Sequence, residues 1–201
     1  MNASRLTLIS HAATEAQLRA AFPLDEPILE RDITRIKDLK WSLPVNASTW
    51  TAPERRAQET SRILGLSPAL SEELRDCDYG QWRGRSMGDL ESQNPEGLLA
   101  WLTDPSSAPH GGESVERLIG RVGSWIDQQR TVRHTIAVTH QAIVRAAIIH
   151  ALQIPTQAFW RIDVAPLTVT DLRFNGALWT VRSTGCALNK SGSAEELTPE
   201  E

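Results

Sequence analysis

Two short apolar runs, each ending in a histidine, constrain the fold of this chain more than any other feature. The first run covers residues 5–10 and leads into His11, and the second covers residues 135–139 and leads into His140. Runs of this length that are rich in β-branched residues and are followed by helix-like sequence are typical of buried parallel strands. Because ligands bind at the carboxyl ends of the strands in an open parallel sheet, we expect both imidazoles at one binding edge.

Strand-like and helix-like segments alternate along the rest of the chain. Residues 47–51, 165–173 and 177–183 are rich in strand formers, and the Asn175-Gly176 pair between the last two predicts a β-hairpin. This alternation predicts a layered α/β sheet whose last hairpin forms an antiparallel edge. Helices are expected at residues 14–21, 28–40, 53–64, 87–103, 113–130 and 141–152.

Length and composition are those of an ordinary globular protein. A chain of 201 residues, 40% of them hydrophobic, favours one domain over residues 1–188, followed by a polar, acidic and disordered tail at 189–201. The net charge of −4 argues against a nucleic-acid partner. The two cysteines fit a reducing compartment. The absence of a signal peptide and of an apolar run of about 20 residues predicts a cytoplasmic protein with no membrane partner. The sequence does not predict the oligomeric state.

The two histidines have a chemistry that suits phosphoryl groups. A neutral imidazole at a strand end, with one nitrogen held by a backbone carbonyl, can attack phosphorus and form a phosphohistidine. A helix that starts at Gln141 would point its first amides at an anion beside His140. The alternative is that both are polar strand-end histidines without a role. No compact ligand motif accompanies them, so we expect no metal and no other cofactor.

An arginine and an aspartate complete the candidate site. Arg56 lies at the start of a predicted helix, where it could fork onto two phosphate oxygens or simply lie on a solvated helix face. Asp76 or Asp78 could protonate a departing alkoxide, although acidic residues in loops are more often only solvated. Neither segment identifies an activity by itself, but the order of the segments along the chain is informative.

Taken in this order, the segments resemble the histidine phosphatase superfamily, also called the phosphoglycerate mutase-like family, over residues 5 to about 155. The family's opening Arg-His-Gly-Glu-Thr is similar to residues 10–14, where Ser10 takes the place of the arginine. Its Ser-Pro-Leu-x-Arg-Ala segment is similar to Ala52-Pro-Glu-Arg-Arg-Ala57, which places the phosphate-binding arginine at Arg56.

Three further motifs carry the same resemblance. Residues 74–84 are similar to the family's Leu-x-Glu-x-x-(Phe/Tyr)-Gly-x-Trp-Glu-Gly, which places the proton donor at Asp76, one methylene shorter than the usual glutamate. Residues 112–114 match a Gly-Glu-Ser motif, and the second catalytic histidine falls on His140. The resemblance implies a three-layer α/β/α sandwich with a mostly parallel central sheet and an antiparallel edge strand.

The resemblance also implies a mechanism without metal. His11 would attack phosphorus, and Asp76 would protonate the leaving oxygen. Arg56 and His140 would stabilise charge on the equatorial oxygens. The other implied phosphate-binding positions are Ser10, Thr14 and Gln141. The prediction is a phosphomonoester hydrolase that acts on a small phosphorylated metabolite through a phosphohistidine intermediate.

Ser10 is the main departure from the family, because loss of one donor from a transition-state cradle costs about 10²–10³ in rate. In a working phosphatase, the missing charge could come from Arg83, Arg5 or Arg161. The chain could instead be a catalytically impaired member that binds a phosphorylated ligand or a partner protein without turnover. A mutase is the third alternative, although the longer insert that mutases carry after the Trp-Glu-Gly segment is missing.

Overall fold

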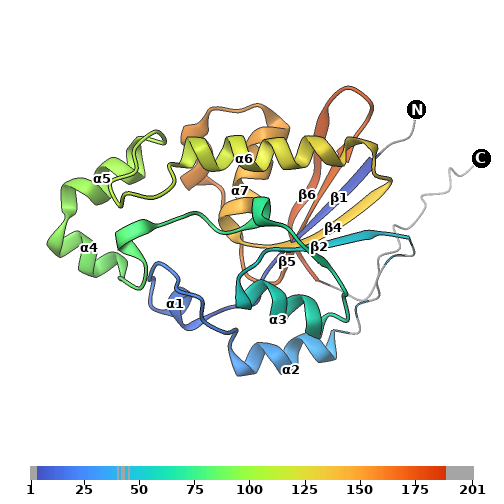
Figure 1. Ribbon diagram of the computed structural model, residues 1–201, viewed down its shortest axis with the longest axis horizontal. Coiled ribbons are helices and arrows are strands. Elements are labelled where there is room, and N and C mark those ends of the chain that lie inside the picture. The colour runs from blue at the N-terminus through green and yellow to red at the C-terminus, as the bar shows by residue number, and fades with distance from the viewer. Residues whose placement is uncertain (1–3, 40, 42–43, 45, 189–201) are drawn as a thin grey trace, which may run out of the picture.

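A computed structural model describes residues 4–39, 41, 44 and 46–188, which form a mixed α/β fold around a six-stranded sheet (Figure 1). The strands are β1 (Ser4–Ser10), β2 (Ser48–Thr51), β3 (Ala69–Leu70), β4 (His134–Thr139), β5 (Thr168–Phe174) and β6 (Trp179–Ala187). Their order is β3-β2-β4-β1-β5-β6. The first four are parallel, whereas β5 runs antiparallel to both of its neighbours. The predicted fold class is therefore confirmed, and the predicted tail at 189–201 lies outside the described residues.

The predicted hairpin forms one edge of the sheet. It turns at Asn175, whose side-chain oxygen accepts hydrogen bonds from the amides of Ala177 and Leu178. Gly176 has a φ of 98°, a conformation that favours glycine. Because β6 reverses the direction of β5, the edge strand runs in the same direction as β1. The antiparallel strand thus lies one place inside the edge at which it was predicted.

The register of β1 and β4 places the two histidines side by side. Ser10 pairs with Thr139, and these are the last residues of the two strands. His11 and His140 follow directly, at the carboxyl ends of adjacent parallel strands. The central apolar residues of both strands are no more than 1% exposed, as expected for strands that are covered on both faces.

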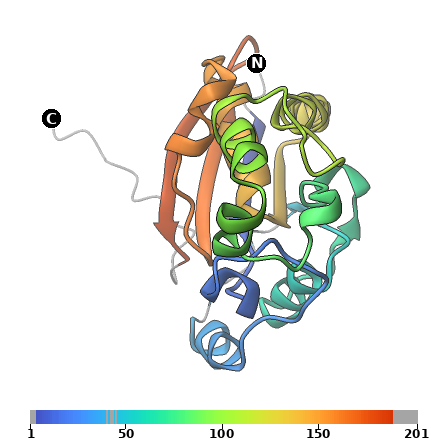
Figure 2. The same ribbon diagram turned by 90° about the vertical axis from the view of Figure 1, so that its left-hand side faces the viewer.

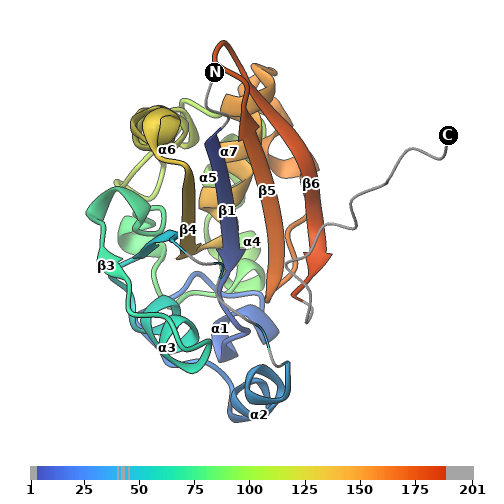
Figure 3. The same ribbon diagram turned by 90° about the vertical axis from the view of Figure 1, so that its right-hand side faces the viewer.

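Helices pack against this sheet and gather at its carboxyl edge. The α-helices in the described part of the chain are α1 (Glu15–Leu18), α2 (Glu30–Asp38), α3 (Arg55–Ile63), α4 (Met87–Gln93), α5 (Pro95–Thr103), α6 (Val115–Gln128) and α7 (Gln141–Leu152). Short 3-10 helices are η1 (Glu72–Leu74), η2 (Gly80–Trp82), η3 (Gln129–Thr131) and η4 (Thr156–Arg161). α6 packs against α7, which lies behind the sheet in Figure 3 and contacts β1 and β6, while α3 contacts β2 and β4. None of these helices is long and apolar enough to cross a membrane.

α1 is shorter than the helix predicted at 14–21. Thr14 and Gln17 form a capping box that fixes its start. Ala20 adopts a left-handed φ of 47°, and this ends the helical path and leads the chain toward Phe22, which is buried. The prediction of a helix beyond residue 18 is therefore wrong, because burial of an aromatic side chain outweighs local helix propensity.

A second hydrophobic cluster joins α4, α5 and η2 to the segment after α1. α4 and α5 extend away from the sheet in Figure 1 and face the viewer in Figure 2. The cluster consists of Phe22, Trp82, Leu90, Leu98 and Trp101. Because Phe22 belongs to this cluster, its burial holds the segment after α1 against α4 and α5.

Candidate active site

The rings of His11 and His140 meet at the carboxyl edge of the sheet. Their centroids are 5.1 Å apart with an interplanar angle of 67°, and the two residues are only 2% and 1% exposed. Asp76 Oδ2 lies 3.5 Å from His140 Nδ1 and 2.6 Å from Arg56 Nη2. The structure therefore brings together four predicted site residues from four separate segments of the chain.

His11 is held as a neutral imidazole. Its Nδ1 lies 2.7 Å from the carbonyl oxygen of Ala12, and because a carbonyl only accepts, Nδ1 carries the hydrogen. Burial, reinforced by the charges of His140 and Arg56, holds the pKa of His11 well below its usual range. The ring is therefore neutral at pH 7, and Nε2 keeps a lone pair that can act as a nucleophile.

Arg56 is a buried arginine that is paired with Asp76. It is 2% exposed, and Nη1 donates to the carbonyl oxygen of Leu24 at 2.8 Å while Nη2 donates to Asp76. Burial opposes ionisation of Asp76, but the charges of His140 and Arg56 outweigh it and lower the pKa of this carboxyl. Asp76 is therefore a carboxylate at neutral pH when it engages the arginine that was predicted to bind phosphate.

The Gly-Glu-Ser segment holds the loop that carries Asp76. The Glu113 amide donates to the carbonyl oxygen of Asp78 at 2.8 Å, and a Cβ on Gly112 would collide with that same oxygen. Asp78, the other candidate proton donor, is exposed, and its carboxylate accepts from the Gly80 amide at 3.0 Å. Asp76 lines a cavity beside His11, whereas Asp78 lines only a neighbouring cavity.

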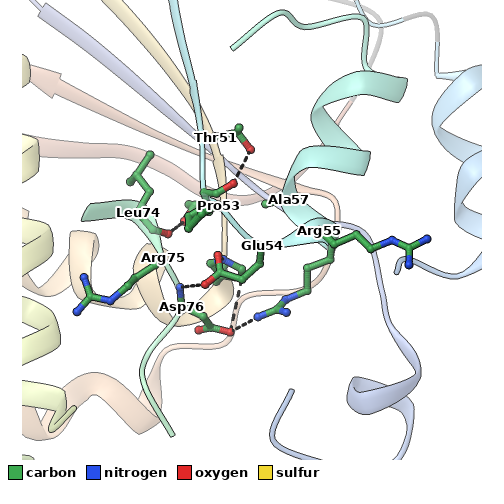
Figure 4. Close-up of polar contacts among 12 residues, drawn as sticks. Thr51, Pro53, Glu54, Arg55, Ala57, Leu74, Arg75 and Asp76 are labelled. Carbon is green, nitrogen blue, oxygen red and sulfur yellow. Dashed lines mark hydrogen bonds and ion pairs between the residues drawn. The ribbon is translucent and has the colours of Figure 1, made fainter. Parts of the chain in front are cut away.

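Glu54 also belongs to the site, although no sequence pattern predicted it. α3 begins at Arg55, two residues later than predicted, so Glu54 is the N-cap. Its Oε2 lies 2.7 Å from His140 Nε2, and its Oε1 accepts the Asp76 amide hydrogen at 3.0 Å (Figure 4). Burial opposes ionisation of Glu54, but the hydrogen bond and charge of His140 outweigh it and lower its pKa to about 2. An acidic residue at a helix start is too common to have signalled this contact.

A cavity of about 140 Å³ opens beside His11. Thr14 and Gln141, two of the predicted phosphate-binding residues, line it. Arg145 was not predicted, and it lines the cavity because it lies one helical turn after Gln141 on the same side of α7. The lining residues are His11, Thr14, Gln17, Ala21, Pro23, Arg56, Asp76, Tyr79, Gln141, Ala142 and Arg145. His140 is outside this lining and contacts the site through His11 and Asp76.

Three buried nitrogen atoms around the cavity have no hydrogen-bond partner. They are Arg56 Nε, His140 Nδ1 and Gln141 Nε2. An unpaired buried polar group costs about 1–3 kcal/mol, so such atoms point to a ligand that would satisfy them. The N-terminus of α7 adds backbone amides, because His140 is its N-cap and makes no capping bond. This arrangement suits a small oxyanion. Among the described residues, no three histidine, cysteine or acidic side chains are arranged to hold a metal ion.

Ser10 does not line the cavity. Its hydroxyl donates to the carbonyl oxygen of Ala165 at 2.7 Å and accepts from the Thr168 amide at 3.0 Å. The residue is completely buried. The structure therefore does not bring Ser10 to the other predicted phosphate-binding residues, because its side chain ties the end of β1 to the start of β5.

None of the three arginines considered as replacement charges lines the His11 cavity. Arg5 lies at the opposite, amino end of β1, and Arg161 is exposed in η4. Arg83 lines a neighbouring cavity of about 280 Å³. The additional arginine of the His11 cavity is instead Arg145.

Relatives of this chain include phosphatases. The adenosylcobalamin/alpha-ribazole phosphatase of Salmonella typhimurium is 28% identical over 177 residues, which cover 80% of this chain and 85% of that protein. The glucosyl-3-phosphoglycerate phosphatase of Mycobacterium tuberculosis is 28% identical over 116 residues, or 50% of this chain and 52% of that protein.

Solved structures show the same fold. A mycobacterial glucosyl-3-phosphoglycerate phosphatase superposes with a TM-score of 0.80 at 21% identity, covering 92% of this chain and 100% of that one. The alpha-ribazole phosphatase of Shigella flexneri gives a TM-score of 0.79 at 23% identity, with 92% and 98% covered. The sequence profile of the histidine phosphatase superfamily (branch 1) matches residues 6–187. With both histidines at the carboxyl edge of the sheet and a match over nearly its whole described length, the chain belongs to the histidine phosphatase superfamily.

Proposed function

We propose that this protein is a metal-independent phosphomonoester hydrolase that acts on a small phosphorylated metabolite through a phosphohistidine on His11. The observation that carries the proposal is a neutral His11 in the wall of a cavity that also contains two arginines and unpaired buried nitrogen atoms. The phosphatase activities of the relatives support the same reaction class.

The first proposed step transfers the phosphoryl group to His11. Nε2 donates its lone pair to phosphorus while the ester P–O bond breaks, and the departing oxygen takes a proton from Asp76. Asp76 takes up that proton when the substrate binds, because the phosphoryl oxygens draw Arg56 away from it and bring negative charge close. Both changes favour the protonated carboxyl.

The second proposed step releases phosphate. Asp76, now ionised, takes a proton from a water molecule while that water attacks phosphorus and the P–N bond to His11 breaks. The products are inorganic phosphate and the neutral imidazole, and Asp76 returns to the carboxylate of the free enzyme when it loses this proton to solvent as phosphate leaves.

Catalysis of phosphoryl transfer depends mainly on positive charge and on positioning of the reacting groups. Arg56 of α3 and Arg145 of α7 supply the charge, and Gln141 and the α7 amides add neutral donors. His140 stabilises the phosphoryl group from beside His11. In this proposal Arg145 supplies the positive charge that Ser10 does not.

A phosphomonoester panel tests the proposal. Sugar, nucleoside and amino-acid phosphates would be assayed in EDTA with the wild type, His11→Ala and, as a matched control remote from the cavity, His134→Gln. We expect turnover by the wild type and the control, none by His11→Ala, and a phosphohistidine in the wild type after rapid quenching into alkali. Phosphate binding without turnover by the wild type would indicate the catalytically impaired member instead. The ion pair between Arg56 and Asp76 favours this alternative, because it engages the arginine that is proposed to bind phosphate. A bisphosphate requirement would indicate a mutase.

A further inference from the structure

Two helices of the site begin at residues whose side chains do not cap them. Glu54 is the N-cap of α3 and His140 is the N-cap of α7, but neither side chain bonds to its own helix. The Arg55 amide of α3 is bonded instead to Asp25 Oδ1 at 2.7 Å. Because N-cap side chains usually satisfy the first amides of their own helices, these two are free for another use.

The two N-cap side chains bond to each other. Glu54 Oε2 lies 2.7 Å from His140 Nε2, and Glu54 Oε1 accepts from the Asp76 amide at 3.0 Å. Figure 4 shows Glu54 and Asp76 approaching one another from α3 and from the loop after η1. One carboxylate thus connects α3, the loop of the proposed proton donor and the N-terminus of α7.

This contact decides where the hydrogens of the His140 ring lie. Glu54 is ionised at neutral pH, and since a carboxylate only accepts, Nε2 carries the shared hydrogen. Nδ1 is then the nitrogen turned toward Asp76 Oδ2, 3.5 Å away, and it has no hydrogen-bond partner. The last torsion of a histidine side chain is broad, and Glu54 makes the one hydrogen bond to this ring among the described residues, so its loss should allow other ring orientations.

We propose that Glu54 is a positioning residue, which holds His140 so that Nε2 faces α3 and Nδ1 faces the phosphoryl group. The family's motif has a leucine at this position, so the contact is a feature of this chain rather than of the motif. Nδ1 can donate to a phosphoryl oxygen only after the ring takes up a second proton from solvent, and Glu54 then balances the charge of the imidazolium. Glu54 acts through His140 and does not touch the substrate; its role rests on the proposed function.

Three variants test this role. Glu54→Leu removes both acceptors, Glu54→Gln keeps the size and one acceptor but removes the charge, and Glu59→Gln is the matched control. Glu59 lies on the same helix, pairs with Arg55 at 2.7 Å and accepts the Ile28 amide at 3.1 Å, but is outside the site. We expect kcat to fall about 10²-fold in Glu54→Leu and about 10-fold in Glu54→Gln, with KM changed less, because ring misplacement acts mainly on the transition state. The control should stay within about twofold of the wild type.

Nitrogen-15 NMR of the His140 ring gives a readout that does not depend on activity. We expect a hydrogen on Nε2 in the wild type and in Glu59→Gln, and a mixture of tautomers in Glu54→Leu. If Glu54→Leu does not fold, Glu54→Gln and the wild-type spectrum decide. A wild-type ring with its hydrogen on Nδ1 alone, or Glu54→Gln with kcat within about twofold of the wild type, would overturn the role. If the wild type turns over no phosphomonoester, the proposed function fails, and the NMR spectra still test the contact.

Discussion

The two ends of β1 and β4 carry similar polar clusters in very different settings. At the amino end, His134 Nε2 lies 3.0 Å from Thr7 Oγ1, and Asp171 pairs with Arg5 at 2.9 Å and with Arg173 at 3.0 Å. Burial, reinforced by the charge of Arg5, lowers the pKa of His134 to about 4. A histidine with a lowered pKa, an arginine and an aspartate therefore occur at both ends of the same strands.

The two clusters differ in burial and in the helices around them. The arginine side chains of the amino-end cluster, Arg5 and Arg173, are 30% and 37% exposed, whereas that of Arg56 is 2% exposed. Charges act more strongly where water is excluded. α3 and α7 begin at the carboxyl end, so the positive ends of both helix dipoles lie at the site. Residue types and a lowered histidine pKa are therefore common to both clusters, whereas burial of the arginine and the helix N-termini distinguish the carboxyl end from the amino end.

Replacing the aspartate of each cluster should give the largest difference in activity between the two ends. Asp76→Asn removes the proposed acid and base, so kcat should fall about 10²–10⁴-fold. Asp171→Asn should leave kcat within about twofold and lower the free energy of unfolding by roughly 1–3 kcal/mol, because two arginines lose their partner. Steady-state kinetics and urea unfolding of both variants make the comparison. Equal losses of activity would contradict the assignment of the site to one end.

Replacing one arginine at each end should give the next largest difference. Arg56→Ala should lower kcat/KM about 10²–10³-fold, since a buried charge that binds the transition state is lost. Arg173→Ala should change kcat/KM by less than about twofold. Initial rates at saturating and limiting substrate measure both effects. A comparable loss in Arg173→Ala would mean that the amino-end cluster takes part in the reaction.

Restoring the family's arginine at position 10 should not raise the activity. Ser10 is completely buried and bonded to Ala165 and Thr168, so Ser10→Arg should overpack this region and lower the free energy of unfolding by about 1–3 kcal/mol. We expect no gain in kcat/KM, which the phosphomonoester assay would measure beside urea unfolding. A tenfold gain at unchanged stability would show that the new side chain reaches the cavity.

The acid limb of the pH profile should depend on His11 and not on His134. Because the pKa of His11 is lowered, the ring stays neutral and nucleophilic at pH values below 6.5, and the rate falls only as it becomes protonated at still lower pH. The acid limb of kcat/KM, corrected for substrate ionisation, should therefore lie below pH 6.5 and should be unchanged in His134→Gln. An acid limb above pH 6.5 would contradict a neutral His11.

Much of the fold could be predicted because its signals are local. The apolar runs that became β1 and β4 and the Asn175-Gly176 turn each depend on neighbouring residues. The end of α1 could not be predicted, because Phe22 is buried among aromatic residues that lie about 60 or more positions further along the chain. The place of β5 in the sheet likewise depends on pairing with β1, at the other end of the sequence.

The sequence by itself determined which residues follow the strand ends, and so it predicted that His11 and His140 would share an edge with Arg56 and Asp76. Only the tertiary structure decided that Ser10 turns away, that Arg145 lines the cavity and that Glu54 bonds to a histidine 86 residues away. The reason is physical: strand identity follows from the hydrophobic pattern of a few adjacent residues. The direction of a side chain follows from the packing and hydrogen bonds of whatever the folded chain places next to it.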